Sequence, residues 1–221
     1  MTRPILITLT APTCSGKSYL LTYIRDTAKR PCLTSTTTRP PREGEVDGLD
    51  YIFITEQESK NIEAQDGFAE LAIFRGARYG VTKKEFERKL SQGPAFLIVE
   101  PSGIDHYVKP ALDMGAVWLK YFVYSKPAVL VERFKKRFEA DTAKALSADI
   151  ASAAYGERYG SGDKVMSTVK AYTDRLIHLL GPESEWFEAK QWDGILYGDK
   201  HPIENLKIID ADIRYKLENN D

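Results

Sequence analysis

The segment near the start of the chain, a strand followed by a glycine-lysine-serine loop and a helix, constrains the fold most. Residues 5–10 form a short apolar run rich in branched side chains and bounded by Pro4 and Pro12, which predicts a buried strand. Residues 18–29 carry apolar side chains at helical spacing. The loop between them reads Ala11, Pro12, Thr13, Cys14, Ser15, Gly16, Lys17 and Ser18. Strand, loop and helix in this order are the context in which such a loop binds phosphate.

The loop fits the phosphate-binding pattern at all but its first position. Ala11 stands where a glycine is usual, and one extra methyl is tolerated if the backbone keeps a negative φ. Loop N–H groups and the positive end of the helix can hold phosphate oxygens. Lys17 is expected to reach the β- and γ-phosphates, and the Ser18 hydroxyl to bind Mg²⁺. The alternative, an ordinary strand-to-helix turn, is disfavoured by the position directly after the first strand.

Composition excludes several classes of protein. The chain has 221 residues, a net charge of −1 and two cysteines, Cys14 and Cys32, outside any Cys/His cluster. A disulfide scaffold, a structural zinc site and a nonspecific nucleic-acid binder are therefore not expected. No apolar stretch approaches the ~18 residues of a membrane span, and the first apolar run is too short for a signal peptide. We expect a cytoplasmic protein without a membrane or nucleic-acid partner.

Apolar strands alternate with helical segments along the rest of the chain. Short apolar runs predict strands at 51–54, 70–74, 95–99 and 117–124. Helical spacing predicts helices at 56–65, 83–90, 126–138 and 165–180. This alternation is typical of an α/β fold with a parallel sheet. Residues 139–170 show little periodicity, and we expect them to form a mobile insertion.

A second polar loop, at 36–45, carries two arginines three residues apart, Arg39 and Arg42, among prolines and acids. Guanidinium groups are suited to bidentate capture of a phosphate, and prolines keep such a loop extended. The phenols of Tyr51 and Tyr79 could join them around a second phosphate. The alternative is a solvated charged loop, and this run by itself does not decide between the two.

Together these segments resemble the guanylate kinases, which phosphorylate GMP with MgATP. The resemblance rests on TTTRPPREGEVDGLDYIF at 36–53, on Phe68-Ala69-Glu70 and on Tyr79-Gly80, and it continues through the Glu100 strand and a basic helix. The main gap is 139–170. The resemblance implies an α/β protein with the three-layer core and central parallel sheet of P-loop NTPases. It also implies a small mixed-strand subdomain that binds the monophosphate, and a helical lid.

The resemblance also divides the chain and assigns roles to its residues. It implies one domain over 1–221, with a core at 1–34, 83–132 and 171–221, a monophosphate-binding segment at 35–82 and a lid at 133–170. The eight loop residues from Ala11 to Ser18 would bind ATP, with Ser18 on Mg²⁺. The implied substrate-binding residues are Ser35, Arg39, Arg42, Tyr51, Glu70, Tyr79 and Glu100. Small-molecule nucleotides are the implied partners, and we expect a monomer or a homodimer.

Within this set, Ser35 and Glu70 would recognise the base. Guanine offers N–H donors at N1 and N2, and an ionised carboxylate is a pure acceptor that can take both. The sequence departs from the family pattern at Val81, which replaces a hydroxyl residue, and at Ile98 and Glu100, which replace the family's Asp-x-Asp. A deoxy or modified guanine nucleotide therefore stays open as the acceptor, and so does a different base.

A set of arginines is expected to clamp the transferring phosphoryl group. Arg133 and Arg137 are i, i+4 neighbours that share one helix face, and Arg175 matches a third position in the following helix. With Lys17 they form the predicted catalytic set, because phosphoryl transfer depends on positioning and charge neutralisation. The alternative is a solvated cluster of bases at the C-terminal end of a helix, where cations are favourable.

The sequence therefore predicts an ATP-dependent kinase for GMP or dGMP. A guanylate kinase-like binding module without catalysis is the alternative from a different class, and the presence of Lys17 and Ser18 disfavours it. A kinase for another base, or for a phosphate acceptor that is not a nucleotide, is a third possibility. The loop at 36–45 weighs against an acceptor that is not a nucleotide.

Overall fold

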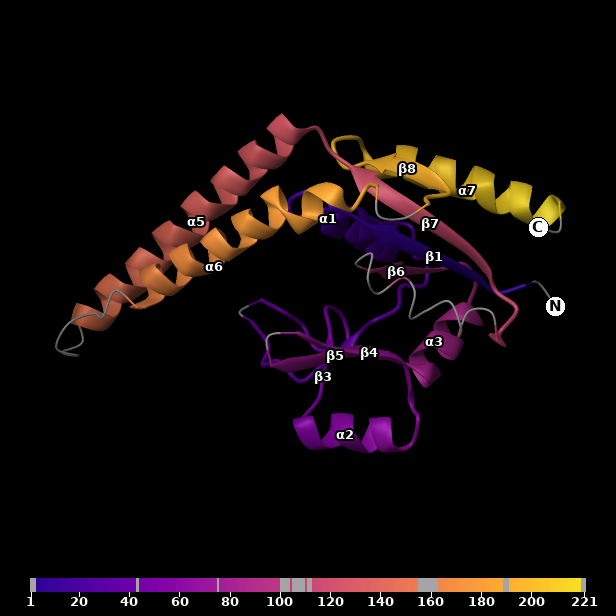
Figure 1. The fold of residues 1–221 in the computed structure, drawn as a ribbon, viewed down its shortest axis with the longest axis horizontal. Coiled ribbons are helices and arrows are strands. Elements are labelled where there is room, and N and C mark those ends of the chain that lie inside the picture. Colours follow the sequence, from indigo (N-terminus) through magenta and orange to yellow (C-terminus); the bar gives the residue numbers. More distant parts are fainter. Residues whose placement is uncertain are drawn as a thin grey trace.

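The protein contains two β-sheets and a pair of long helices that project from one of them (Figure 1). This computed structural model describes residues 3–42, 44–74, 76–99, 104, 110, 113–154, 163–188 and 191–219. The first sheet has the strand order β6-β1-β7-β8, and every pairing in it is parallel. Its strands are β1 (Ile5–Thr10), β6 (Ala95–Ile98), β7 (Val117–Tyr124) and β8 (Gly194–Tyr197).

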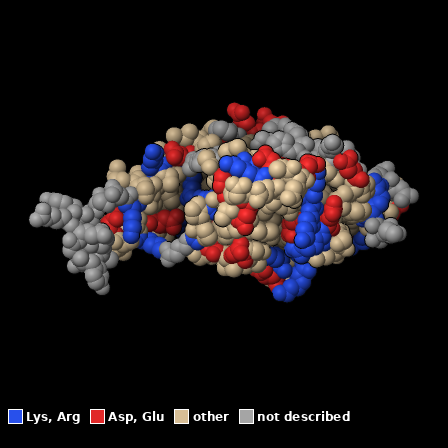
Figure 2. All heavy atoms as spheres, turned by 90° about the horizontal axis from the view of Figure 1, so that it is seen from below, with Lys and Arg blue, Asp and Glu red and all other residues tan. Residues whose placement is uncertain are grey.

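Charged side chains of both signs occur on the molecular surface (Figure 2). Lys and Arg are interspersed with Asp and Glu over the face shown in Figure 2, as the net charge of −1 would suggest. Among the residues that the structure describes, no helix combines the length and the apolar character that crossing a bilayer requires.

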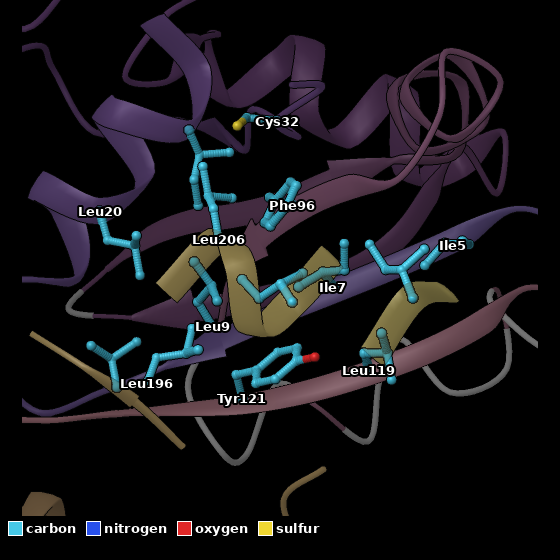
Figure 3. Close-up of a cluster of buried hydrophobic side chains, with 14 of the residues drawn as sticks. Ile5, Ile7, Leu9, Leu20, Cys32, Phe96, Leu119, Tyr121, Leu196 and Leu206 are labelled. Carbon is cyan, nitrogen blue, oxygen red and sulfur yellow. The ribbon is translucent and has the colours of Figure 1, made fainter. Parts of the chain in front are cut away.

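The core lies on both faces of the parallel sheet, because β1 is buried along its whole length. Its alternate residues Ile5, Ile7 and Leu9 point into one cluster, which also contains residues of β7, β8, α1 (Lys17–Thr22) and α7 (Pro202–Glu218) (Figure 3). Leu6 points to the opposite face and joins a second cluster with Phe86 of α3 (Lys83–Leu90). The sheet is thus enclosed between two layers, which confirms the predicted three-layer α/β fold.

A second, mixed sheet lies below the core in Figure 1, with the order β3-β2-β5-β4. Its strands are β2 (Thr36–Thr37), β3 (Ile52–Phe53), β4 (Phe68–Phe74) and β5 (Ala77–Thr82). Helix α2 (Glu56–Ala64) covers one face of it. Arg78 of β5 reaches that helix, where Nε donates to Ser59 Oγ at 2.8 Å and Nη2 donates to Glu63 Oε2 at 2.5 Å. Side chains at neighbouring β5 positions point to the opposite face.

The lid differs from expectation, because residues 139–154 are helical rather than irregular. They continue α5, which spans Pro127–Ala154 and packs side by side with α6 (Asp163–Leu180). This stretch is rich in alanine, the residue with the highest helix propensity, so it forms a helix without a strong apolar stripe. The basic cluster therefore lies within a helix, and the interpretation as a helix end is wrong. Residues 155–162 of the expected insertion fall outside the described residues.

Tyr172 holds the two lid helices together. Its ring lies 5.4 Å from the ring of Phe134 and 5.2 Å from that of Phe138, measured between centroids, and its hydroxyl donates to the Asp141 carboxylate. Burial, with the Asp141 hydrogen bond adding to it, raises the pKa of Tyr172 to about 12. The lid helices are therefore joined by aromatic packing and by a phenol that stays neutral.

Burial in the parallel sheet predicts a large difference between two chemically identical substitutions. Ile7 is 0% exposed and Ile195 of β8 is 37% exposed. Ile7→Ala should lower the free energy of unfolding by about 2–5 kcal/mol, because it leaves a cavity in the first cluster. Ile195→Ala should cost less than about 1 kcal/mol. Equal losses in urea unfolding would contradict the assignment of the core.

Candidate functional site

The loop between β1 and α1 turns back on itself through two residues with positive φ. Cys14 has a φ of 64° and Gly16 a φ of 96°. Gly16 is the N-cap of α1 and has no side chain to bond the first helical N–H groups. The start of the helix therefore presents its N–H groups to the space above the loop, as an anion-binding turn requires. Ala11 keeps a negative φ, and its methyl is buried in the first core cluster.

Residues directly after β7 and β8 contact this loop and restrict its position. Ser125, directly after β7, donates its hydroxyl to Ser15 O at 2.7 Å. A Cβ on Gly198, directly after β8, would lie 1.7 Å from Ser15 O, so no larger residue fits there without a shift. A Cβ on Gly16 would likewise lie 2.7 Å from Gly198 O. All these groups lie at the carboxyl ends of parallel strands, where open α/β sheets bind ligands.

The polar groups of the loop fit a phosphate ligand. Lys17 Nζ donates to Ala11 O at 3.0 Å and so lies across the loop. Ser18 is exposed in the first turn of α1, where its hydroxyl could bind a metal ion. The Ser15 hydroxyl is buried and has no hydrogen-bond partner within the described part of the chain. Buried hydroxyls are normally paired, and a phosphate oxygen would supply such a partner.

One of the three predicted arginines, Arg133, contacts the loop directly, and the charges of all three act on the Cys14 thiol. Arg133 donates from Nη1 to Cys14 O at 3.3 Å and from Nη2 to Gly198 O at 3.0 Å. Burial raises the pKa of the Cys14 thiol, and three positive charges oppose that rise: Arg137, Arg175 and Arg133. The guanidinium carbon of Arg175 lies 4.9 Å from the centre of the Tyr172 ring, which orients it from α6. The lid thus contributes its positive charge to the phosphate loop.

Sequence reasoning missed one residue of this site, Glu183. Its carboxylate accepts the N–H of Thr13, and its Oε1 accepts the Thr13 hydroxyl at 2.9 Å. Glu183 belongs to η2 (Pro182–Glu185), a short 3₁₀ helix that follows α6. No local pattern marks it, because its contact with the loop spans 170 positions of the sequence.

The predicted acceptor residues Arg39, Tyr51 and Tyr79 come together in the second sheet. The guanidinium carbon of Arg39 lies 5.4 Å from the centre of the Tyr51 ring, and that ring packs edge-on against Tyr79 at 6.0 Å. Arg39 Nη2 donates to both oxygens of Glu45 at 2.9 Å, while the backbone N–H of Arg42 donates to Glu45 Oε2 at 2.7 Å. The Arg42 side chain is exposed.

Electrostatics favour a charged Glu45 in this cluster. Burial raises the pKa of Glu45, but the Arg42 N–H and the Arg39 guanidinium outweigh burial and hold that pKa below its ordinary value. Burial also raises the pKa of Tyr51, so its phenol remains a neutral hydrogen-bonding group. The cluster therefore combines the Arg39 guanidinium, two phenols and the Glu45 carboxylate, which is already hydrogen-bonded to that guanidinium.

The predicted base-reading residue Glu70 lies on the same face of the sheet as Tyr79. Glu70 of β4 pairs with Val81 of β5, and Tyr79 is two positions from Val81, so the three side chains share a face. Val81 is 0% exposed within the second core cluster. Its apolar character therefore has a packing explanation. Ser35 is half-buried before β2, where its carbonyl accepts from Ile52 N at 2.9 Å.

Packing also explains part of the second departure from the family pattern, the loss of Asp-x-Asp at residues 98–100. Ile98 is partly buried against the first core cluster, where a carboxylate would lose solvation. Glu100 lies outside the described residues, so its expected role near the substrate stays a prediction.

The parallel sheet and the glycine-lysine-serine loop between its strand β1 and helix α1 define a P-loop α/β protein. Within that class, the chain belongs to the guanylate kinase family, whose model, described as guanylate kinase, matches residues 1–160.

Individual relatives agree with this assignment. The guanylate kinase of Helicobacter pylori is 42% identical over 89 residues, which cover 40% of this chain and 43% of that protein. The guanylate kinase of Bifidobacterium longum is 39% identical over 119 residues, covering 52% and 61%. The chain thus spans about half the length of the curated relatives it matches. The crystal structure of guanylate kinase from Anaplasma phagocytophilum has the same fold, with a TM-score of 0.54 at 16% identity, covering 98% of this chain and 88% of that one.

The close approach of Gly198 to the loop predicts the effect of a single methyl. Gly198→Ala should lower the free energy of unfolding by about 1–3 kcal/mol or more, because its Cβ would overlap backbone rather than a movable side chain. Ser125→Ala is the matched variant, since it removes a hydrogen bond to the same carbonyl without adding an atom, and it should cost about 1 kcal/mol. A Gly198→Ala protein as stable as the wild type in denaturant unfolding would contradict this packing.

Proposed function

We propose that this protein transfers the γ-phosphoryl group of MgATP to GMP or dGMP, giving ADP and the nucleoside diphosphate. The observation that carries the proposal is the contact of Arg133, from lid helix α5, with the phosphate loop, where its guanidinium donates to Cys14 O and Gly198 O. Binding alone needs only the loop. Positive charge close to that loop is what would stabilise a phosphoryl group in transfer.

In the proposed reaction, an oxygen of the acceptor phosphate attacks the γ-phosphorus while the bond to the bridging oxygen breaks and ADP leaves. The protein has little covalent work to do, so rate comes from positioning and charge. Lys17 and the loop N–H groups would hold the phosphates of ATP, and Mg²⁺ on the Ser18 hydroxyl would neutralise part of their charge. Arg133, Arg137 and Arg175 would neutralise the charge that develops on the transferring group.

The acceptor phosphate is proposed to bind Arg39, Arg42, Tyr51 and Tyr79. Glu45 supports this assignment, because its carboxylate shows that Arg39 binds an anion here: Arg39 Nη2 donates to both of its oxygens. A phosphate at Arg39 would take over the guanidinium from Glu45. The exposed Arg42 side chain would then add a second cation.

Base recognition is proposed to rest on Ser35 and Glu70. A carboxylate at Glu70 would accept from N1 and N2 of guanine, whereas adenine would leave that acceptor unpaired at the cost of a few kcal/mol. Val81 offers no hydroxyl to a base, and its complete burial gives its side chain a packing role. A guanine nucleotide with a modified base or a deoxyribose is therefore a second candidate acceptor.

A coupled ADP-release assay across all nucleoside monophosphates tests the proposal. Glu70→Gln should reduce the preference for guanine over adenine nucleotides by about 10- to 100-fold, because the variant loses the anionic acceptor. Arg42→Ala is the matched comparison, and it should raise KM for every monophosphate without changing their order. Absence of turnover with every guanine nucleotide would overturn the proposed function.

A further inference from the structure

Glu183 makes an unusual contact for an acid, because both of its carboxylate oxygens are engaged by one residue of the phosphate loop. The Thr13 N–H donates to one oxygen and the Thr13 hydroxyl to the other, at 2.9 Å for the hydroxyl. The residue is 8% exposed. A buried carboxylate needs such donors, and here the donors belong to a loop built to hold anions.

The charge of Glu183 also acts on a group of the loop on which three arginines act. It raises the pKa of the Cys14 thiol, the same group whose pKa Arg137, Arg175 and Arg133 lower. The carboxylate and the three guanidinium groups therefore act on one point of the loop. A backbone N–H, a hydroxyl and nearby guanidinium groups are also the donor set that a phosphate group binds.

The position of Glu183 in the chain links this contact to the lid. Helix α6 carries Arg175 and ends at Leu180, and η2 begins two residues later at Pro182. Gly181 joins them, and its N–H still donates to Ile177 O at 2.9 Å. Glu183 also lies beyond residues 1–160, the part of the chain that the family model matches.

We propose that Glu183 is an internal occupant of the phosphate loop that the terminal phosphate of ATP must displace. The inference rests on the proposed function, because it assumes that the loop binds ATP. Two anions cannot share the Thr13 donors, and like charges at such short range repel each other. The fraction of molecules with Glu183 on the loop therefore lowers the apparent affinity for ATP. Displacement releases η2 from the loop and frees the base of α6, the helix that carries Arg175.

Calorimetric titration with MgATP, without an acceptor, tests this inference. Glu183→Gln keeps the shape of the side chain and removes its charge, so MgATP should bind about tenfold more tightly than to the wild type. Glu185→Gln is the control, because Glu185 lies in the same turn, is exposed and carries the same charge. Its affinity should equal that of the wild type.

Unchanged or weaker binding by Glu183→Gln would overturn the inference, because a residue that merely braces the loop gives that result. If neither protein binds MgATP, the proposed function fails as well. If Glu183→Gln and the wild type bind MgATP equally and the wild type turns over a guanine nucleotide in the coupled assay, only the role of Glu183 fails.

Hydrogen exchange of the wild-type protein gives a second test that needs no substitution. Saturating MgATP should increase deuterium uptake in the peptide that covers residues 181–188, because η2 loses its anchor on Thr13. Unchanged or reduced uptake in that peptide would contradict displacement. This measurement remains decisive even if Glu183→Gln fails to fold.

Discussion

The site depends on one close contact between two backbone segments at the carboxyl end of the parallel sheet. The turn after β8 passes so close to the loop after β1 that Gly198 has no room for a Cβ beside Ser15 O. Gly16 faces the same turn from the other side and adopts a positive φ. This contact fixes the loop on one side, and Arg133 bonds to both segments. The position of the lid helix is thereby tied to the phosphate loop.

The net charge of −1 conceals two centres in which a carboxylate is already bonded to hydrogen-bond donors of the site. At the second sheet, Arg39 is bonded to the Glu45 carboxylate, and at the loop, Thr13 donates to the Glu183 carboxylate. In both places a carboxylate takes up the donors proposed for a phosphate. Such pairing stabilises guanidinium groups and loop N–H groups that would otherwise be partly buried without a partner. It also means that each phosphate would have to displace an internal anion.

The sequence predicted those parts of the fold whose signal is local. The apolar runs of β1, β6 and β7 and the Gly-Lys-Ser loop each carry their own pattern, and the three-layer α/β fold follows from them. Residues 139–154 were expected to be irregular because an alanine-rich helix with one packed side lacks a clear apolar stripe. Glu183 was missed because its place in the site depends on its hydrogen bonds with Thr13, which lies 170 positions away in the sequence. The sequence shows at Val81 only the loss of a hydroxyl group, because the complete burial of this side chain depends on the tertiary structure.

The central claim is that the lid arginines act on a phosphoryl group at the loop, and steady-state kinetics with saturating MgATP and GMP test it most directly. Arg137 and Lys135 lie two residues apart on α5, and both are exposed. Arg137 lowers the pKa of the Cys14 thiol in the loop, whereas Lys135 Nζ lies 3.8 Å from the Glu139 carboxylate. Arg137→Ala should lower kcat by about 10³-fold or more, because a transition-state charge is lost, whereas Lys135→Ala should leave kcat unchanged. An Arg137→Ala enzyme with the kcat of the wild type would contradict the account.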